Sequence, residues 1–131
     1  MILTALAFAA AVQNRCTTLD ARLPRALAGW TRGGAGLDTR HAVTLPARGG
    51  SAETRVTIRK PGTFGIAVDQ QAWIDVYPAG RGRRALDIAS EGRGVSCSTI
   101  RKIVRYRLRP GSYRVTVGKV AGARVKLMLV R

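Results

Sequence analysis

The sequence predicts an all-β protein: an antiparallel β-sandwich of jelly-roll type with about eight strands, preceded by a short helical or loop segment. Two observations support this class. From residue 41 onward, apolar and polar side chains alternate with period two, as in strands that are buried on one face. Turns rich in Gly and Pro separate these segments, and no helical pattern alternates with them. A closed barrel is the alternative, because periodicity does not fix the strand order.

The first residues, 1–11, are interpreted as a signal peptide. A short apolar run covers residues 2–12, and Ala9-Ala10-Ala11 offers the small residues that a cleavage site near Ala11 requires. The run is shorter than the roughly 20 residues that cross a bilayer core, so no transmembrane span is expected after cleavage. No Lys or Arg precedes it, so either the amino group of Met1 supplies the positive charge or the true start lies upstream. A buried N-terminal helix or strand is the alternative.

Residues 12–40 are expected to form a loop with one or two helical turns that pack on the core. Apolar side chains recur there at helical spacing, at Leu19, Leu23, Leu27 and Trp30. Pro24 interrupts this pattern. Residues 31–40 are rich in Gly and lack the GxxxxGK[ST] motif of phosphate-binding loops, so we expect a connector there.

Residues 41–131 are predicted to form the β-sandwich domain. The expected strands are, in chain order, 41–46, 53–60, 63–69, 72–78, 85–90, 99–109, 112–118 and 123–131. Their alternation directs one set of apolar side chains inward: Val43, Leu45, Val56, Ile58, Phe64, Ile66, Val68, Ile74, Val76, Leu86, Ile88, Val104, Tyr106, Leu108, Tyr113, Val115, Val117, Val125, Leu127 and Leu129.

The two cysteines, Cys16 and Cys97, are predicted to form one disulfide bond. An even number of cysteines in an exported chain favours such a bond. Closing a loop of about 80 residues would stabilise the fold by roughly 4 kcal/mol on the chain-entropy model. Two free thiols in a reducing compartment are the alternative. A metal site is not expected, because neither cysteine belongs to a CxxC motif or has a histidine nearby.

The chain is strongly basic, with 23 Lys and Arg against 7 Asp and Glu and a net charge of +16. Such a charge favours contact with anionic surfaces. Most of the positive residues are Arg and are spread along the chain, so a GC-rich genome is the alternative explanation. The candidate polyanion-binding residues lie together in one acid-free stretch: Arg101, Lys102, Arg105, Arg107 and Arg109.

Arg105, Arg107 and Arg109 share one face of the strand predicted at 99–109. Alternate residues on a strand lie about 6.7 Å apart, so this row needs anions, neighbouring acids or water around it. Lipopolysaccharide, an acidic glycan or nucleic acid are candidate ligands. Nucleic acid is disfavoured, because aromatic residues are few and Tyr106 lies on the opposite face of the strand.

Pro110-Gly111 suits the two central positions of a type II turn, where proline fixes φ and glycine accepts a positive φ. Tyr113 follows closely enough for its hydroxyl to bond the backbone upstream, as in a tyrosine corner.

Two resemblances follow from these residues. The segment LRPGSYRVTV is similar to the closing hairpin of pre-peptidase C-terminal domains and other small secreted jelly rolls. Most of the chain after residue 15 resembles a group of small, uncharacterised exported bacterial proteins. The matching elements are Cys16, Leu23-Pro24, Leu27-Ala28-Gly29-Trp30, Asp69, Ala72-Trp73-Ile74-Asp75-Val76, Cys97-Ser98-Thr99-Ile100-Arg101-Lys102, Pro110-Gly111 and Tyr113.

Some members of that group carry the label homogentisate 1,2-dioxygenase, which would imply an iron ion held by two His and one Glu. His41 is the single histidine of this sequence, so the chain does not supply that set of ligands. His41 is in phase with the strand at 41–46 and is interpreted as a packed or rim residue. No GxSxG or HExxH motif occurs, and neither a catalytic residue, a metal nor a cofactor is expected.

The carboxylates of Asp69 and Asp75 are expected to pair with surrounding arginines; a Ca²⁺ site or an acid–base pair is the alternative. Trp73 and Tyr77 share a face with Asp75. That face is expected to be the second side of a strand that is buried on both faces, and an exposed aromatic platform for sugar is the alternative.

The sequence therefore favours an exported, non-enzymatic β-sandwich protein of the periplasm or the cell exterior. Its expected role is structural or interactive, with an unidentified protein or an anionic envelope component as partner. A polyanion-binding module is the second hypothesis, and an enzyme is the third.

Overall fold

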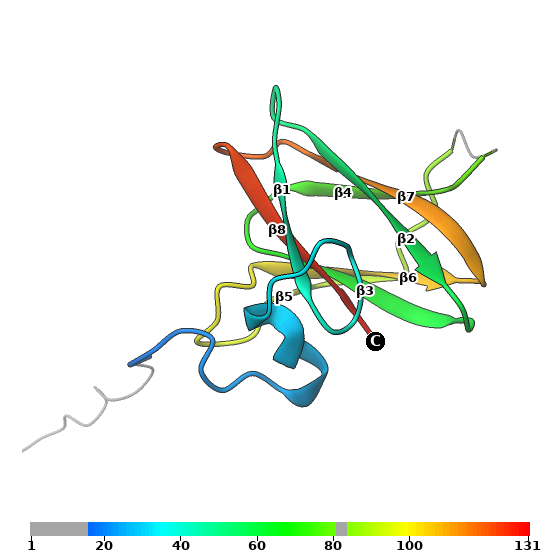
Figure 1. The fold of residues 1–131 in the computed structure, drawn as a ribbon. Helices are drawn as coiled ribbons and strands as arrows, with labels where there is room; N and C mark the ends of the chain where they lie inside the picture. The colour runs from blue at the N-terminus through cyan, green and yellow to red at the C-terminus, as the bar shows by residue number, and fades with distance from the viewer. Residues whose placement is uncertain (1–15, 81–83) are drawn as a thin grey trace, which may run out of the picture.

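The computed structural model describes residues 16–80 and 84–131, and this part of the chain folds into two antiparallel sheets (Figure 1). One sheet has the order β1 (Ala42–Pro46), β8 (Arg124–Val130), β3 (Gly62–Val68), β6 (Lys102–Leu108), β5 (Ser90–Arg93). The other has the order β2 (Ala52–Ile58), β7 (Gly111–Gly118), β4 (Trp73–Pro78). The predicted all-β sandwich is confirmed. The predicted signal peptide, 1–11, lies outside the described residues.

The chain changes sheet at each connection between consecutive strands except that between β5 and β6. This alternation is the connectivity of a jelly roll, in which strands wrap around one core. β6 and β7 therefore belong to different sheets, and the expectation of a closing hairpin at Pro110-Gly111 is wrong. Gly111 has φ 145°, away from the value of about 80° that a type II turn requires. Pro110-Gly111 forms a corner between the sheets.

The predicted tyrosine corner is confirmed at this point. The hydroxyl of Tyr113 donates to the carbonyl oxygen of Arg109 at 2.7 Å and accepts the backbone N–H of Arg109 at 2.9 Å. Both bonds hold the chain where it leaves the five-stranded sheet. A second tyrosine, Tyr106, is buried between the sheets and donates its hydroxyl to the carbonyl oxygen of Ile74 at 3.0 Å. Tyrosine hydroxyls therefore tie the two sheets together.

The strand predicted at 85–90 is wrong. The backbone is irregular until Ala89, and β5 begins only at Ser90, the last residue of the predicted strand, and runs on into the stretch from residue 91 that was expected to be a loop. Leu86 is half-buried and donates its N–H to the carbonyl oxygen of Val76 on β4 at 2.8 Å, while Ile88 is 48% exposed. After the hydrogen bond between Leu86 and β4, this segment crosses to the edge of the five-stranded sheet, where β5 pairs with β6. It therefore does not continue as a strand beside β4.

The main core lies between the sheets and contains most of the predicted inward side chains. Leu45 is half-buried and lies at its margin. A second apolar cluster covers the outer face of the five-stranded sheet and was not predicted from alternation. It consists of Leu27, Trp30, Ala42, Ala67, Ile100, Ile103, Met128 and Val130. β3 and β8 are consequently buried on both faces over part of their length.

A short 3₁₀ helix, η2 (Arg25–Thr31), supplies Leu27 and Trp30 to this second cluster. The predicted helical turn that packs on the core is thereby confirmed, and Pro24 precedes the helix as its N-cap instead of interrupting it. Leu19, expected on the same apolar side, is 53% exposed. The reason is that the helix begins only after Pro24, so Leu19 lies outside its periodicity.

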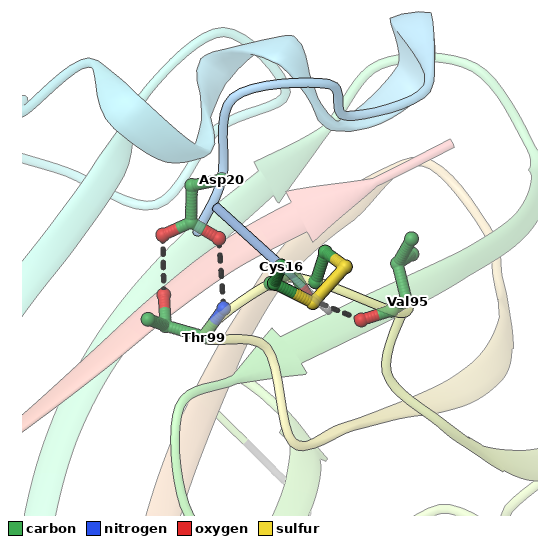
Figure 2. The surroundings of a disulfide bond; sticks show 6 residues. Cys16, Asp20, Val95 and Thr99 are labelled. Carbon is green, nitrogen blue, oxygen red and sulfur yellow. Dashed lines mark hydrogen bonds between the residues drawn. A yellow bond between two sulfur atoms is a disulfide. The ribbon is translucent and has the colours of Figure 1, made fainter. Parts of the chain in front are cut away.

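The disulfide between Cys16 and Cys97 is present, and it fastens the N-terminal segment to the loop before β6 (Figure 2). Close by, the carboxylate of Asp20 accepts the backbone N–H of Thr99 at 2.7 Å and its hydroxyl at 2.6 Å. The hydroxyl of Thr99 also accepts the indole N–H of Trp30 at 2.8 Å. One threonine thus connects the disulfide region with the buried tryptophan.

Candidate functional site

The predicted basic residues occupy different surroundings along β6. Arg105 and Arg107 lie on the outer face of the five-stranded sheet, opposite the buried side chains of Val104, Tyr106 and Leu108. Arg101 precedes the strand, and Arg109 follows it at the corner. Lys102 has a different partner, because its Nζ lies 3.8 Å from the carboxylate of Glu91 on β5. Lys102 therefore does not belong to the exposed row.

Arg105 lies against the sheet. Its neighbour on β3 is Gly65, and a Cβ atom at that glycine would lie 2.8 Å from Nη1 of Arg105. Because Gly65 has no side chain, the guanidinium of Arg105 has space to lie over β3. Arg105 is therefore half-buried, whereas Arg107 is exposed. Within the described residues, no ion pair involves Arg101, Arg105, Arg107 or Arg109.

The outer face of the three-stranded sheet carries a second candidate site, formed by side chains in register across β2, β7 and β4. Thr116 of the central strand faces Glu53 on one side and Asp75 on the other. In the next row, Arg114 faces Arg55 and Tyr77. Hence each row across this sheet combines side chains that are distant in the sequence.

Trp73 lies beside this acidic row and is 60% exposed. The expectation that this face is buried is therefore wrong, because no segment of the described chain covers the three-stranded sheet as η2 covers the other. The tryptophan, both acids and Thr116 line an open hollow of about 490 Å³. The other lining residues are Pro46, Arg48, Ser51, Ala52, Val117 and Gly118.

Cations stack on the aromatic side chains of this face. The ammonium of Lys119 lies 4.3 Å from the ring centroid of Trp73, and the guanidinium of Arg114 lies 4.3 Å from that of Tyr77. Arg114 also approaches the carboxylate of Glu53 at 3.8 Å. Both distances lie within the roughly 6 Å at which a cation is attracted to the face of an aromatic ring.

Asp75 makes no ion pair with a described residue, and neither does Asp69, so the expected arginine pairs are absent within that range. The carboxylate of Asp69 accepts the backbone N–H of Lys126 at 3.1 Å and the side-chain amide of Gln70 at 3.2 Å. Asp69 follows β3 and Asp75 lies on β4, which belong to different sheets. The structure therefore does not place the two carboxylates on one face.

His41 lies at the start of β1, half-exposed, with its Nδ1 atom 3.2 Å from the carboxylate of Asp38. The same carboxylate accepts the backbone N–H groups of Arg40 and His41 at 2.7 and 2.8 Å. Burial opposes ionisation, but these hydrogen bonds outweigh it and lower the pKa of Asp38 from its ordinary value of 3.8. Among residues 16–80 and 84–131, no three His, Cys, Asp or Glu side chains gather as metal ligands.

Sequence reasoning found Trp73, Asp75 and Tyr77 on one strand face but missed Glu53, Thr116 and Lys119 as their neighbours. Alternation did direct Glu53 and Thr116 outward; the missing information was that β7 lies between β2 and β4. No family model matches the chain, and no curated protein matches it significantly. The described helical residues contain no segment with the length and apolar character needed to cross a membrane.

Proposed function

We propose that the protein is an exported, non-enzymatic β-sandwich with a structural or interaction role in the cell envelope or outside the cell. The observation that carries the proposal is the bond between Cys16 and Cys97. Disulfide bonds persist in oxidising compartments and are rare in reducing ones. Both cysteines are exposed, so a reducing environment would have access to the bond.

The experiment is an intact-mass measurement on protein recovered from a periplasmic fraction, with and without reduction. We expect a mass that corresponds to cleavage near Ala11. Alkylation should modify neither cysteine before reduction and both Cys16 and Cys97 after it. Recovery in the cytoplasmic fraction, uncleaved and with both thiols alkylated at once, would contradict the proposal.

Polyanion binding by the arginine row is the second candidate function. The supporting observation is that Arg105, Arg107 and Arg109 have no acidic partner among the described residues, whereas Lys102 has one. Acidic lipopolysaccharide or glycan would neutralise this row, and its affinity would fall steeply with salt.

The test compares two triple variants of equal charge on immobilised heparin. One replaces Arg105, Arg107 and Arg109 with Gln; the control replaces three scattered, exposed arginines, Arg25, Arg59 and Arg124, with Gln. If the row binds polyanions, the first variant elutes at clearly lower salt than the control. Equal elution of the two variants would show that only net charge matters.

A further inference from the structure

The outer face of the three-stranded sheet presents an aromatic ring to solvent at a fixed position. Trp73 is 60% exposed and belongs to a regular strand, β4. Among the described residues, the other exposed large apolar side chains, Leu19 and Ile88, lie on irregular segments. A rigidly held, solvent-facing ring loses little conformational entropy when a ligand stacks on it.

Hydrogen-bond acceptors lie next to this ring. Glu53, Thr116 and Asp75 form one row across three adjacent strands, and adjacent strands are about 4.8 Å apart. Ionised carboxylates accept hydrogen bonds but cannot donate them. Asp75 has no cationic partner among the described residues, so its oxygens remain available to a ligand. A matching ligand must therefore offer several hydroxyl or amide donors.

The hollow has the size of a small-ligand site. Its volume of about 490 Å³ falls within the range of roughly 300 to 1,000 Å³ that is typical of such sites. Trp73 lines it, whereas Lys119, which stacks on that ring, does not. A ligand in the hollow would thus lie beside the Trp73 ring without having to contact Lys119.

We propose that this hollow binds a neutral saccharide, an inference that rests on the proposed interaction role of the protein. One sugar ring stacks its C–H face on Trp73, because the negative face of the indole attracts weakly positive hydrogens. Sugar hydroxyls donate to the carboxylates of Asp75 and Glu53, which are strong, charge-assisted acceptors. Asp75 has no cationic partner among the described residues, so its charge disfavours phosphate, sulfate or uronate groups beside it, although Arg48 also lines the hollow and Arg114 approaches Glu53.

The test uses the purified, disulfide-bonded protein and two neutral probes, cellohexaose and chitohexaose, in calorimetric titrations. We expect at least one probe to bind, with little dependence on salt. Trp73→Ala should weaken this binding roughly tenfold or more, which is the loss expected for one aromatic stacking partner. Asp75→Asn should weaken it by a smaller factor. Leu19→Ala, which removes an exposed apolar side chain elsewhere, is the matched control and should leave the affinity unchanged.

Failure of both probes to bind would overturn the inference, as would equal affinity in wild type and the Trp73→Ala variant. Because Trp73 and Leu19 are both exposed, their replacement should leave the fold intact. Thermal unfolding of each variant verifies this. Binding that is restricted to a sulfated oligosaccharide would overturn it too. The proposed export is measured separately by intact mass, so absence of saccharide binding and absence of export are distinguishable results.

Discussion

The three tyrosines of the chain allow the tyrosine corner to be tested against internal controls. Tyr113→Phe removes one hydroxyl and with it two hydrogen bonds, of 2.7 and 2.9 Å, to the backbone of Arg109. A hydrogen bond contributes a net of about 1 kcal/mol to stability. Because Arg109 is exposed and water can replace part of the loss, we expect the free energy of unfolding to fall by about 1.5 to 2 kcal/mol.

The other two tyrosines provide graded comparisons. Tyr106→Phe removes one buried hydrogen bond to the carbonyl oxygen of Ile74, so we expect a loss of about 1 kcal/mol. The hydroxyl of Tyr77 forms no hydrogen bond with any described residue, and Tyr77→Phe should stay within about 0.5 kcal/mol of wild type.

The assay is equilibrium unfolding in urea, followed by tryptophan fluorescence, because Trp30 is fully buried and reports on loss of the core. The midpoint should decrease in the order Tyr77→Phe, Tyr106→Phe, Tyr113→Phe, with equal dependence on denaturant. If Tyr113→Phe were as stable as Tyr77→Phe, the corner would contribute nothing and the reasoning from its two bonds would be refuted.

Three further predictions concern the N-terminal segment and the start of the sandwich. Reducing the bond between Cys16 and Cys97, whose sequence separation is 81, should lower the free energy of unfolding by roughly 4 kcal/mol; equal urea midpoints with and without reductant would contradict this. Thr99→Val should cost about 2 kcal/mol, because the indole N–H of Trp30 loses its acceptor, whereas Thr99→Ser should retain most of the stability. Since the pKa of Asp38 is lowered in the folded state, its ionised form stabilises the protein above the unfolded pKa, and this contribution disappears as pH falls through the folded value. The stability difference between wild type and Asp38→Asn should therefore shrink below about pH 4; a difference that stays constant down to about pH 2 would refute the assignment.

Alternation alone identified the buried and exposed faces of most strands, because a strand that is buried on one side has apolar side chains at every second residue. It failed at 85–90, where Leu86 and Ile88 have the right spacing but the segment must change sheets. It also could not reveal that Ala67, Met128 and Val130 are covered by η2, since their burial depends on a segment far away in the sequence.

The candidate site on the three-stranded sheet was only partly accessible to sequence reasoning. Glu53 and Asp75 lie on either side of Thr116, because β7 pairs between β2 and β4, two strands that precede it in the sequence. Lateral neighbours of this kind follow from strand order, which hydrophobic periodicity does not encode. The disulfide could be predicted because the two cysteines of a chain that was expected to be exported leave a single intramolecular pairing.

The strand order has a consequence for the sequence of events during synthesis. None of the first four strands pairs with another of the four: β1, β2, β3 and β4 each find their hydrogen-bonding partners only among β6, β7 and β8. A chain that is delivered from its N-terminus thus cannot complete any of these ladders until residues beyond Cys97 have emerged. Such long-range pairing makes folding slow. Both cysteines of the bond between Cys16 and Cys97 are synthesised before β6, β7 and β8, the strands that complete the two sheets.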